Sequence, residues 1–179
     1  PVSGSGTYSI SGGSAAVGGS LIVSDGTLEI QDDQDVELEI AGDLGFGDDA
    51  TFTVSSGKYP TIGMTGASSG VVLDAGAVGS ELDGLGALTL VFEPEDIAVI
   101  KTIEAAGQDK GEALPDAEDF GSSNFVVNEL VVGNEQGWGQ GGATGEITLR
   151  LINDNDNRTG DEALYVNALG IEAGGVIDS

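Results

Sequence analysis

The sequence contains no cysteine and no histidine. Without cysteine the chain can form no disulfide, no thiolate metal site and no cysteine nucleophile. Without histidine it has no imidazole base and no histidine-ligated metal, and a Ser-His-Asp triad is excluded. The two absences together remove a large part of the enzyme repertoire.

Basic residues are scarce as well. The chain has 5 Lys and Arg against 31 Asp and Glu, which gives a formal net charge of −26. Such a surface repels polyanions and anionic membranes, so we expect no nucleic-acid binding. Divalent cations, cationic partners or a saline medium suit it better, and the acid excess favours solubility. A halophilic origin would explain the same excess.

Long apolar runs are also missing, because no stretch approaches the roughly 18 residues that a membrane-spanning helix needs. The first residues, PVSGSGTYSISGG, lack the charged head and apolar stretch of a signal peptide. We therefore interpret this sequence as a mature product or a fragment of a longer protein. Neither terminus has a charged amphipathic cap, which indicates either a fragment or end-to-end stacking.

Short alternating strands dominate what remains. Leu28 and Ile30 alternate with polar neighbours, and the pattern recurs at Leu38 and Ile40 and again at Phe52. This is strand periodicity with one dry and one wet face. The 31 glycines supply the tight turns between such strands. The run ALTLVF, residues 87–92, is apolar nearly throughout and predicts a strand covered on both faces.

The gaps between these strands are too short for helical crossovers, so we expect an all-β fold. The sequence repeats one unit, which is an apolar strand followed by a Gly or Asp turn and another strand. This repeat favours a right-handed parallel β-helix. An antiparallel β-sandwich is the alternative. At about 20 residues per coil the chain would form eight or nine coils.

The whole chain, residues 1–179, is expected to form a single β-solenoid domain. Residues 1–20 are interpreted as an N-terminal extension or a first coil. The least periodic stretches, 105–124 and 133–145, are expected to be surface loops.

Two stretches resemble known repeats. The text GTLEI…LEIAGDLGFGDDATFTVSSG resembles the β-strand repeats of bacterial autotransporter-type and PEP-CTERM-type surface proteins. The text ITLRLINDNDNRTGDEALYVNALGIEAGGVID is similar to a closing module of large secreted planctomycete proteins. The resemblance covers residues 20–57 and 125–178. It implies a β-solenoid located outside the cell and implies no shared catalytic residues. The module usually continues into a further strand, so the last coil is expected to be incomplete.

The loop NDNDNRTGDE, residues 153–162, is the candidate metal site. Calcium prefers six to eight hard oxygen ligands and tolerates loop geometry, although the spacing here fits no EF-hand. A solvated turn rich in Asx residues is the alternative interpretation. Two other acidic runs, QDDQD at 31–35 and GDD at 47–49, are interpreted as exposed turns. The candidate calcium ligands are Asn153, Asp154, Asn155, Asp156, Asp161 and Glu162.

Trp138, in the glycine-rich text QGWGQGG, is the candidate contact for a glycan or a partner. Its glycine neighbours cannot bury it locally, but it could equally cap the edge of the solenoid. Glycan-cleaving enzymes on β-helices pair carboxylates with basic and aromatic groups, which are rare here. We therefore do not expect an enzyme, and a polysaccharide lyase or hydrolase is the least favoured function.

The expected function is that of an extracellular structural protein. We expect a surface, matrix or filament subunit that self-associates by stacking its β-solenoid, with no catalytic residues and with calcium as the one cofactor candidate. A glycan-binding adhesin module is the alternative.

Overall fold

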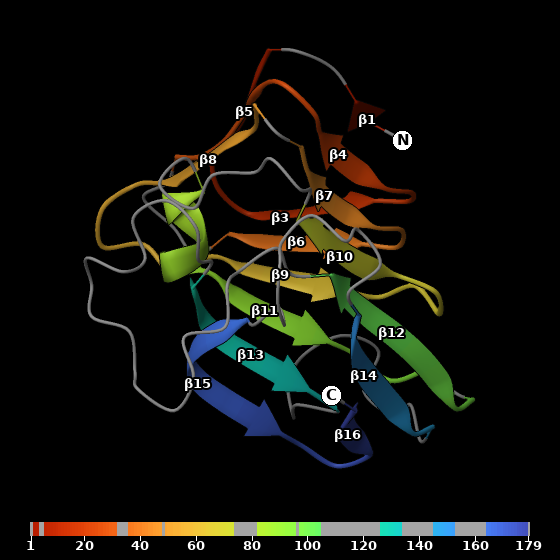
Figure 1. The fold of residues 1–179 in the computed structure, drawn as a ribbon. Coiled ribbons are helices and arrows are strands. Elements are labelled where there is room, and N and C mark those ends of the chain that lie inside the picture. The colour runs from red at the N-terminus through yellow and green to blue at the C-terminus, as the bar shows by residue number, and fades with distance from the viewer. Residues whose placement is uncertain are drawn as a thin grey trace, which may run out of the picture.

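A computed structural model describes residues 2–3, 6–31, 36–47, 49–73, 82–95, 97–104, 126–133, 145–152 and 164–178. In this part of the chain the strands form three parallel sheets, which we call sheets A, B and C. The chain visits sheet A, then B, then C, and returns to A one level further along (Figure 1). Successive levels are the coils of a solenoid.

Sheet A has seven strands and sheet C has six among the described residues. Sheet A consists of β1 (Val2–Ser3), β4 (Leu21–Val23), β7 (Leu44–Phe46), β10 (Gly70–Leu73), β12 (Val99–Glu104), β14 (Ile147–Ile152) and β16 (Gly175–Asp178). Sheet C consists of β3 (Ser14–Val17), β6 (Glu37–Ile40), β9 (Thr61–Met64), β11 (Thr89–Phe92), β13 (Val126–Val132) and β15 (Tyr165–Ile171).

Sheet B is shorter, with three strands in the described part of the chain. They are β2 (Thr7–Ile10), β5 (Thr27–Ile30) and β8 (Thr51–Val54). In the fourth coil a 3₁₀-helix, η1 (Asp83–Ala87), packs against β8. Residues 105–125 and 134–144 lie outside the described residues, and so do most of the two predicted surface loops.

Every strand pair in the three sheets is parallel. The predicted parallel β-helix is therefore confirmed, and the antiparallel sandwich is wrong. The first coil consists of β1, β2 and β3, one strand in each of the three sheets.

The coils are longer and fewer than the strand pattern predicts. The register of sheet A joins Val2 to Leu21 in the first coil, but it joins Val99 to Ile147 in a later one. The later coil therefore takes up more than twice the length of chain. The seven strands of sheet A correspond to six turns between β1 and β16. Insertions between the strands of the later coils account for the difference.

Side chains of equal orientation stack across the coils into ladders that fill the interior. On sheet C one ladder runs from Leu38 through Ile62 and Leu90 to Leu130, and all four side chains are buried. In parallel in-register strands each such ladder places apolar side chains about 4.8 Å apart, so burial at one level supports burial at the next.

Two rings reinforce the centre of this interior. Phe46 of β7 and Phe52 of β8 stack at a centroid distance of 5.4 Å. On β11 the consecutive residues Leu90, Val91 and Phe92 are all buried. A strand buried on both faces is therefore present as predicted, but it begins at Thr89, because Ala87 belongs to η1.

Glycine permits the turns between coils at specific places. Gly57, between β8 and β9, has a φ of +76°, a left-handed conformation that other residues rarely adopt. Gly66 lies so close to the previous coil that a Cβ atom would collide with the carbonyl oxygen of Ala41. Gly66 keeps the coils in contact where the chain bends from sheet C into sheet A.

Candidate functional site

The sequence-predicted site residues lie outside the described residues. This applies to the candidate calcium loop at 153–162, to Trp138 and to most of the acidic run at 31–35. Within the described ranges, no group of three or more Asp or Glu side chains could hold a metal ion. The described residues form three further features, which are the two terminal coils, a polar corner inside the solenoid and a groove on sheet A.

The last coil presents core positions at its surface. Leu169 of β15 pairs in register with the buried Leu130, and Ile171 pairs with the buried Val132. Parallel in-register strands orient paired side chains alike, so Leu169 and Ile171 occupy inward positions. They are nevertheless 51% and 55% exposed. Two apolar ladders of the interior are therefore exposed at their last described members, Leu169 and Ile171.

The first coil carries no charged side chain. No charged side chain occurs before Asp25, in a chain of net charge −26. Most of its side chains are small, and the larger Tyr8 and Ile10 are partly buried against the core, as is Val17. Among the described residues the first coil is therefore uncharged and supplies one edge strand to each of the three sheets.

Hydroxyl groups of the first coil also contact the acids of the second. Ser9 Oγ donates to Glu29 at 3.3 Å, and Ser14 Oγ donates to Glu37 at 3.2 Å. Thr89 and Glu129 repeat this contact between β11 and β13 at 3.2 Å. Because a hydroxyl residue lies opposite each of these carboxylates, two like charges do not face each other across the strands.

The two terminal coils of sheet C share one set of ladders. Ala15 begins the ladder that ends at Leu169, and Val17 begins the ladder that ends at Ile171. If β3 of a second copy paired with β15 in the same register, its Ala15 would lie against Leu169 and its Val17 against Ile171. Neither β3 nor β15 contains a charged residue, so this contact would bring no charges together.

A lysine lies inside the solenoid. Lys101 of β12 is fully buried between the inward residues Val99 and Ile103, and its ammonium group donates to the backbone oxygen of Met64. Burial lowers the pKa of Lys101 from 10.5 to about 8, against the opposing attraction of Glu95 and Glu93. A charged group is thus held in an apolar interior at neutral pH.

Glu93 completes this corner. It follows β11, and its Oε1 atom is buried without a hydrogen-bond partner among the described residues. Burial raises the pKa of Glu93, and repulsion from Glu39 and Glu95 adds to that effect while Lys101 opposes it. The buried Lys101 and the half-buried Glu93 make this corner a source of pH-dependent stability.

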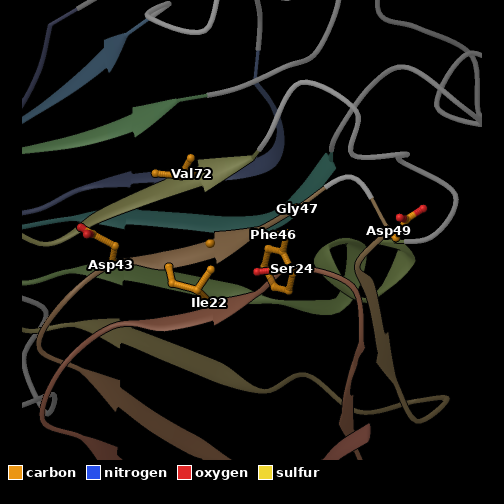
Figure 2. A pocket seen from close by; sticks show the side chains of 8 residues that line it. Ile22, Ser24, Asp43, Phe46, Gly47, Asp49 and Val72 are labelled. Carbon is orange, nitrogen blue, oxygen red and sulfur yellow. The ribbon is translucent and has the colours of Figure 1, made fainter. Parts of the chain in front are cut away.

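A groove of about 430 Å³ lies on the outer face of sheet A (Figure 2). Asp43 and Gly45 alternate with the buried Leu44 and Phe46 of β7, so they face outward. In the outward ladder Gly45 lies between Ile22 and Val72. The missing side chain at Gly45 opens the groove. Its lining residues are Ile22, Ser24, Asp43, Gly45, Phe46, Gly47, Asp49 and Val72.

The fold and these surfaces define the protein as a parallel β-helix with an apolar terminal coil and an acidic coat. Comparison with protein-family models, curated proteins and solved structures found no match for the chain. In the described part of the chain no helix has the length and apolar character to cross a membrane.

The sequence analysis did not predict three features of the structure, which are the uncharged first coil, the buried Lys101 and the groove on sheet A. The neutral first coil could have been found, because the absence of charge before Asp25 is visible in the sequence. Lys101 could not, because residues 97–103 have apolar side chains in both alternating sets of positions. The groove depends on the pairing of Gly45 with Ile22 and Val72, which only the register reveals.

Proposed function

We propose that the chain is an extracellular structural subunit that self-associates by stacking its β-helix end to end. The observation that carries the proposal is the exposure of Leu169 and Ile171 at inward positions of the last coil. An exposed apolar ladder beside unpaired strand edges is a surface that proteins normally cover. The first coil of a second copy is the occupant that we propose.

The distribution of charge supports stacking along the solenoid axis. The first coil carries no charged side chain. Among the described residues 164–178 the two acids are Asp178, which is paired with Arg150 at 2.9 Å, and Glu172. The middle coils carry most of the described acids, so like charge repels copies that approach side by side. Axial contacts are thus favoured over lateral ones.

The mechanism of such a subunit is passive. Backbone ladders that run from β3 to β15 supply rigidity, and in-register stacking would extend them from one copy to the next. The contact is heterologous, because the last coil of one copy meets the first coil of another, and repetition of it gives an open filament. The acidic coat supplies solubility and sites for cation bridging.

A location outside the cell is part of the proposal. Its support is the resemblance of residues 20–57 and 125–178 to repeats of bacterial surface and secreted proteins, together with the acid excess. Protease treatment of intact cells tests the location, since an external protein is cleaved while a cytoplasmic marker survives.

Electron microscopy of the purified chain tests the assembly. We expect thin unbranched filaments whose length grows with protein concentration. Added salt should lengthen or bundle them because it screens the repulsion between acidic coats. Monodisperse particles at every concentration and salt level would contradict the proposal.

A further inference from the structure

The groove on sheet A has two different kinds of surface. Its middle is apolar, because the side chains of Ile22 and Val72 lie on either side of Gly45, whose buried backbone is covered by the tip of Ile22. Figure 2 shows Asp43 at one end of this apolar stretch and Asp49 toward the other. The groove therefore offers an aliphatic floor with one carboxylate at each end.

The two carboxylates are too far apart to hold one metal ion. Asp43 precedes the three residues of β7, and Asp49 follows Gly47 on its far side. The four residue steps from Asp43 to Gly47 alone span about 13 Å in extended backbone. A calcium ion needs its oxygen ligands within about 2.6 Å. The pair suits a ligand that has two separate cationic groups.

Asp43 is held in place by the fold. Its Oδ1 atom accepts a hydrogen bond of 3.0 Å from the backbone N–H of Gly70, and its own N–H donates to Ser20 Oγ. The Asp43 side chain is half-buried at the rim of the groove, whereas Asp49 is exposed. The lining residues include no basic and no histidine side chain. A cation placed between them meets no competing positive charge from the lining.

We propose that this groove binds an extended aliphatic polyamine. The methylene chain packs against the side chains of Ile22 and Val72, where it removes apolar surface from water. The terminal ammonium groups donate to Asp43 and Asp49 in charge-assisted hydrogen bonds. The net charge of −26 raises the local concentration of such a polycation around the molecule.

Isothermal titration calorimetry with spermine at low ionic strength tests the proposal. Putrescine, butylamine and Mg²⁺ serve as a shorter diamine, a monoamine and a compact dication. We expect spermine to bind in a one-to-one complex and more tightly than all three, since only spermine spans both carboxylates over the apolar floor. Equal binding of spermine and Mg²⁺ would overturn the proposal, because it would show attraction of counterions alone.

Matched variants locate the site. Asp43→Asn and Asp49→Asn should each weaken spermine binding about three- to fivefold, the range for one partly exposed ion pair. Gly45→Ala keeps the charge but fills the groove, and it should weaken binding as well. Asp25→Asn removes an exposed carboxylate from the turn before β5 and should change affinity by less than about twofold. An equal loss in Asp25→Asn and Asp43→Asn would refute the site.

Discussion

Leu169 lies directly above Leu130 in the same inward ladder of sheet C, yet Leu130 is 3% exposed and Leu169 is 51% exposed. The two side chains differ in whether another coil covers them. Full burial of a leucine is worth about 1.5–3 kcal/mol relative to exposure. A second copy placed on β15 would gain part of that free energy at Leu169 and again at Ile171.

Replacement of the buried lysine should stabilise the protein. Lys101→Met removes a charge from the apolar interior, and we expect the free energy of unfolding at pH 7 to rise by about 2–3 kcal/mol. The depressed pKa of about 8 means that the folded wild type releases its proton before the unfolded chain does. The wild type therefore gains stability as the pH rises from about 8 to 10.5.

Urea denaturation of both proteins between pH 7 and pH 10.5 measures this difference. The advantage of Lys101→Met should be full below about pH 8 and should shrink as the pH approaches 10.5. Lys58→Met, a change near the surface of the turn between β8 and β9, is the control and should show little pH-dependent advantage. A constant difference between wild type and Lys101→Met at all pH values would show that Lys101 is not desolvated.

Glu93 should act in the opposite direction on the pH scale. Its pKa is raised above 4.5 in the folded state, so the folded protein holds the proton more tightly than the unfolded chain. Stability therefore falls as the pH rises from 4.5 through the folded pKa. Glu93→Gln should match the wild type at acid pH and exceed it at pH 7, with chemical denaturation at both pH values as the measurement. If Glu93→Gln and the exposed control Glu146→Gln change the free energy of unfolding by the same amount at both pH values, burial does not destabilise the charged form of Glu93.

Two glycine substitutions should differ in their effects. In Gly66→Ala the new Cβ meets the backbone oxygen of Ala41, so a coil must shift, and we expect a loss of about 1–3 kcal/mol or more. In Gly45→Ala the nearest atom is the flexible end of Ile22, which can move aside at little cost. Thermal unfolding monitored by circular dichroism compares the two variants. Equal melting temperatures would contradict the close approach of coils at Gly66.

The fold was predictable because its main signal is local. Alternation at Leu28 and Ile30 and at Leu38 and Ile40 identifies the inward face of a strand, and all four side chains are buried. Gaps of a few residues leave no room for helices, which favoured the solenoid. Phe52 is buried as the same alternation predicts.

The number of coils and the surfaces of interest were not predictable in this way. Coil length depends on insertions between strands, whose size a strand pattern does not constrain. Gly45 forms a groove only because the register sets it between Ile22 of the preceding coil and Val72 of the following coil. The exposure of Leu169 likewise depends on its position in the last coil, whereas its sequence environment resembles that of a buried ladder residue.

Sedimentation velocity of the wild type beside two single variants tests the stacking of coils most directly. Leu169→Asp places a charge in the proposed joint, and Ile100→Asp places the same charge at an exposed residue on the outer face of sheet A. With folding of each checked by circular dichroism, we predict oligomers that grow with concentration for the wild type and Ile100→Asp, and a monomer for Leu169→Asp. A monomeric wild type, or equal assembly of Leu169→Asp and the wild type, would contradict end-to-end stacking.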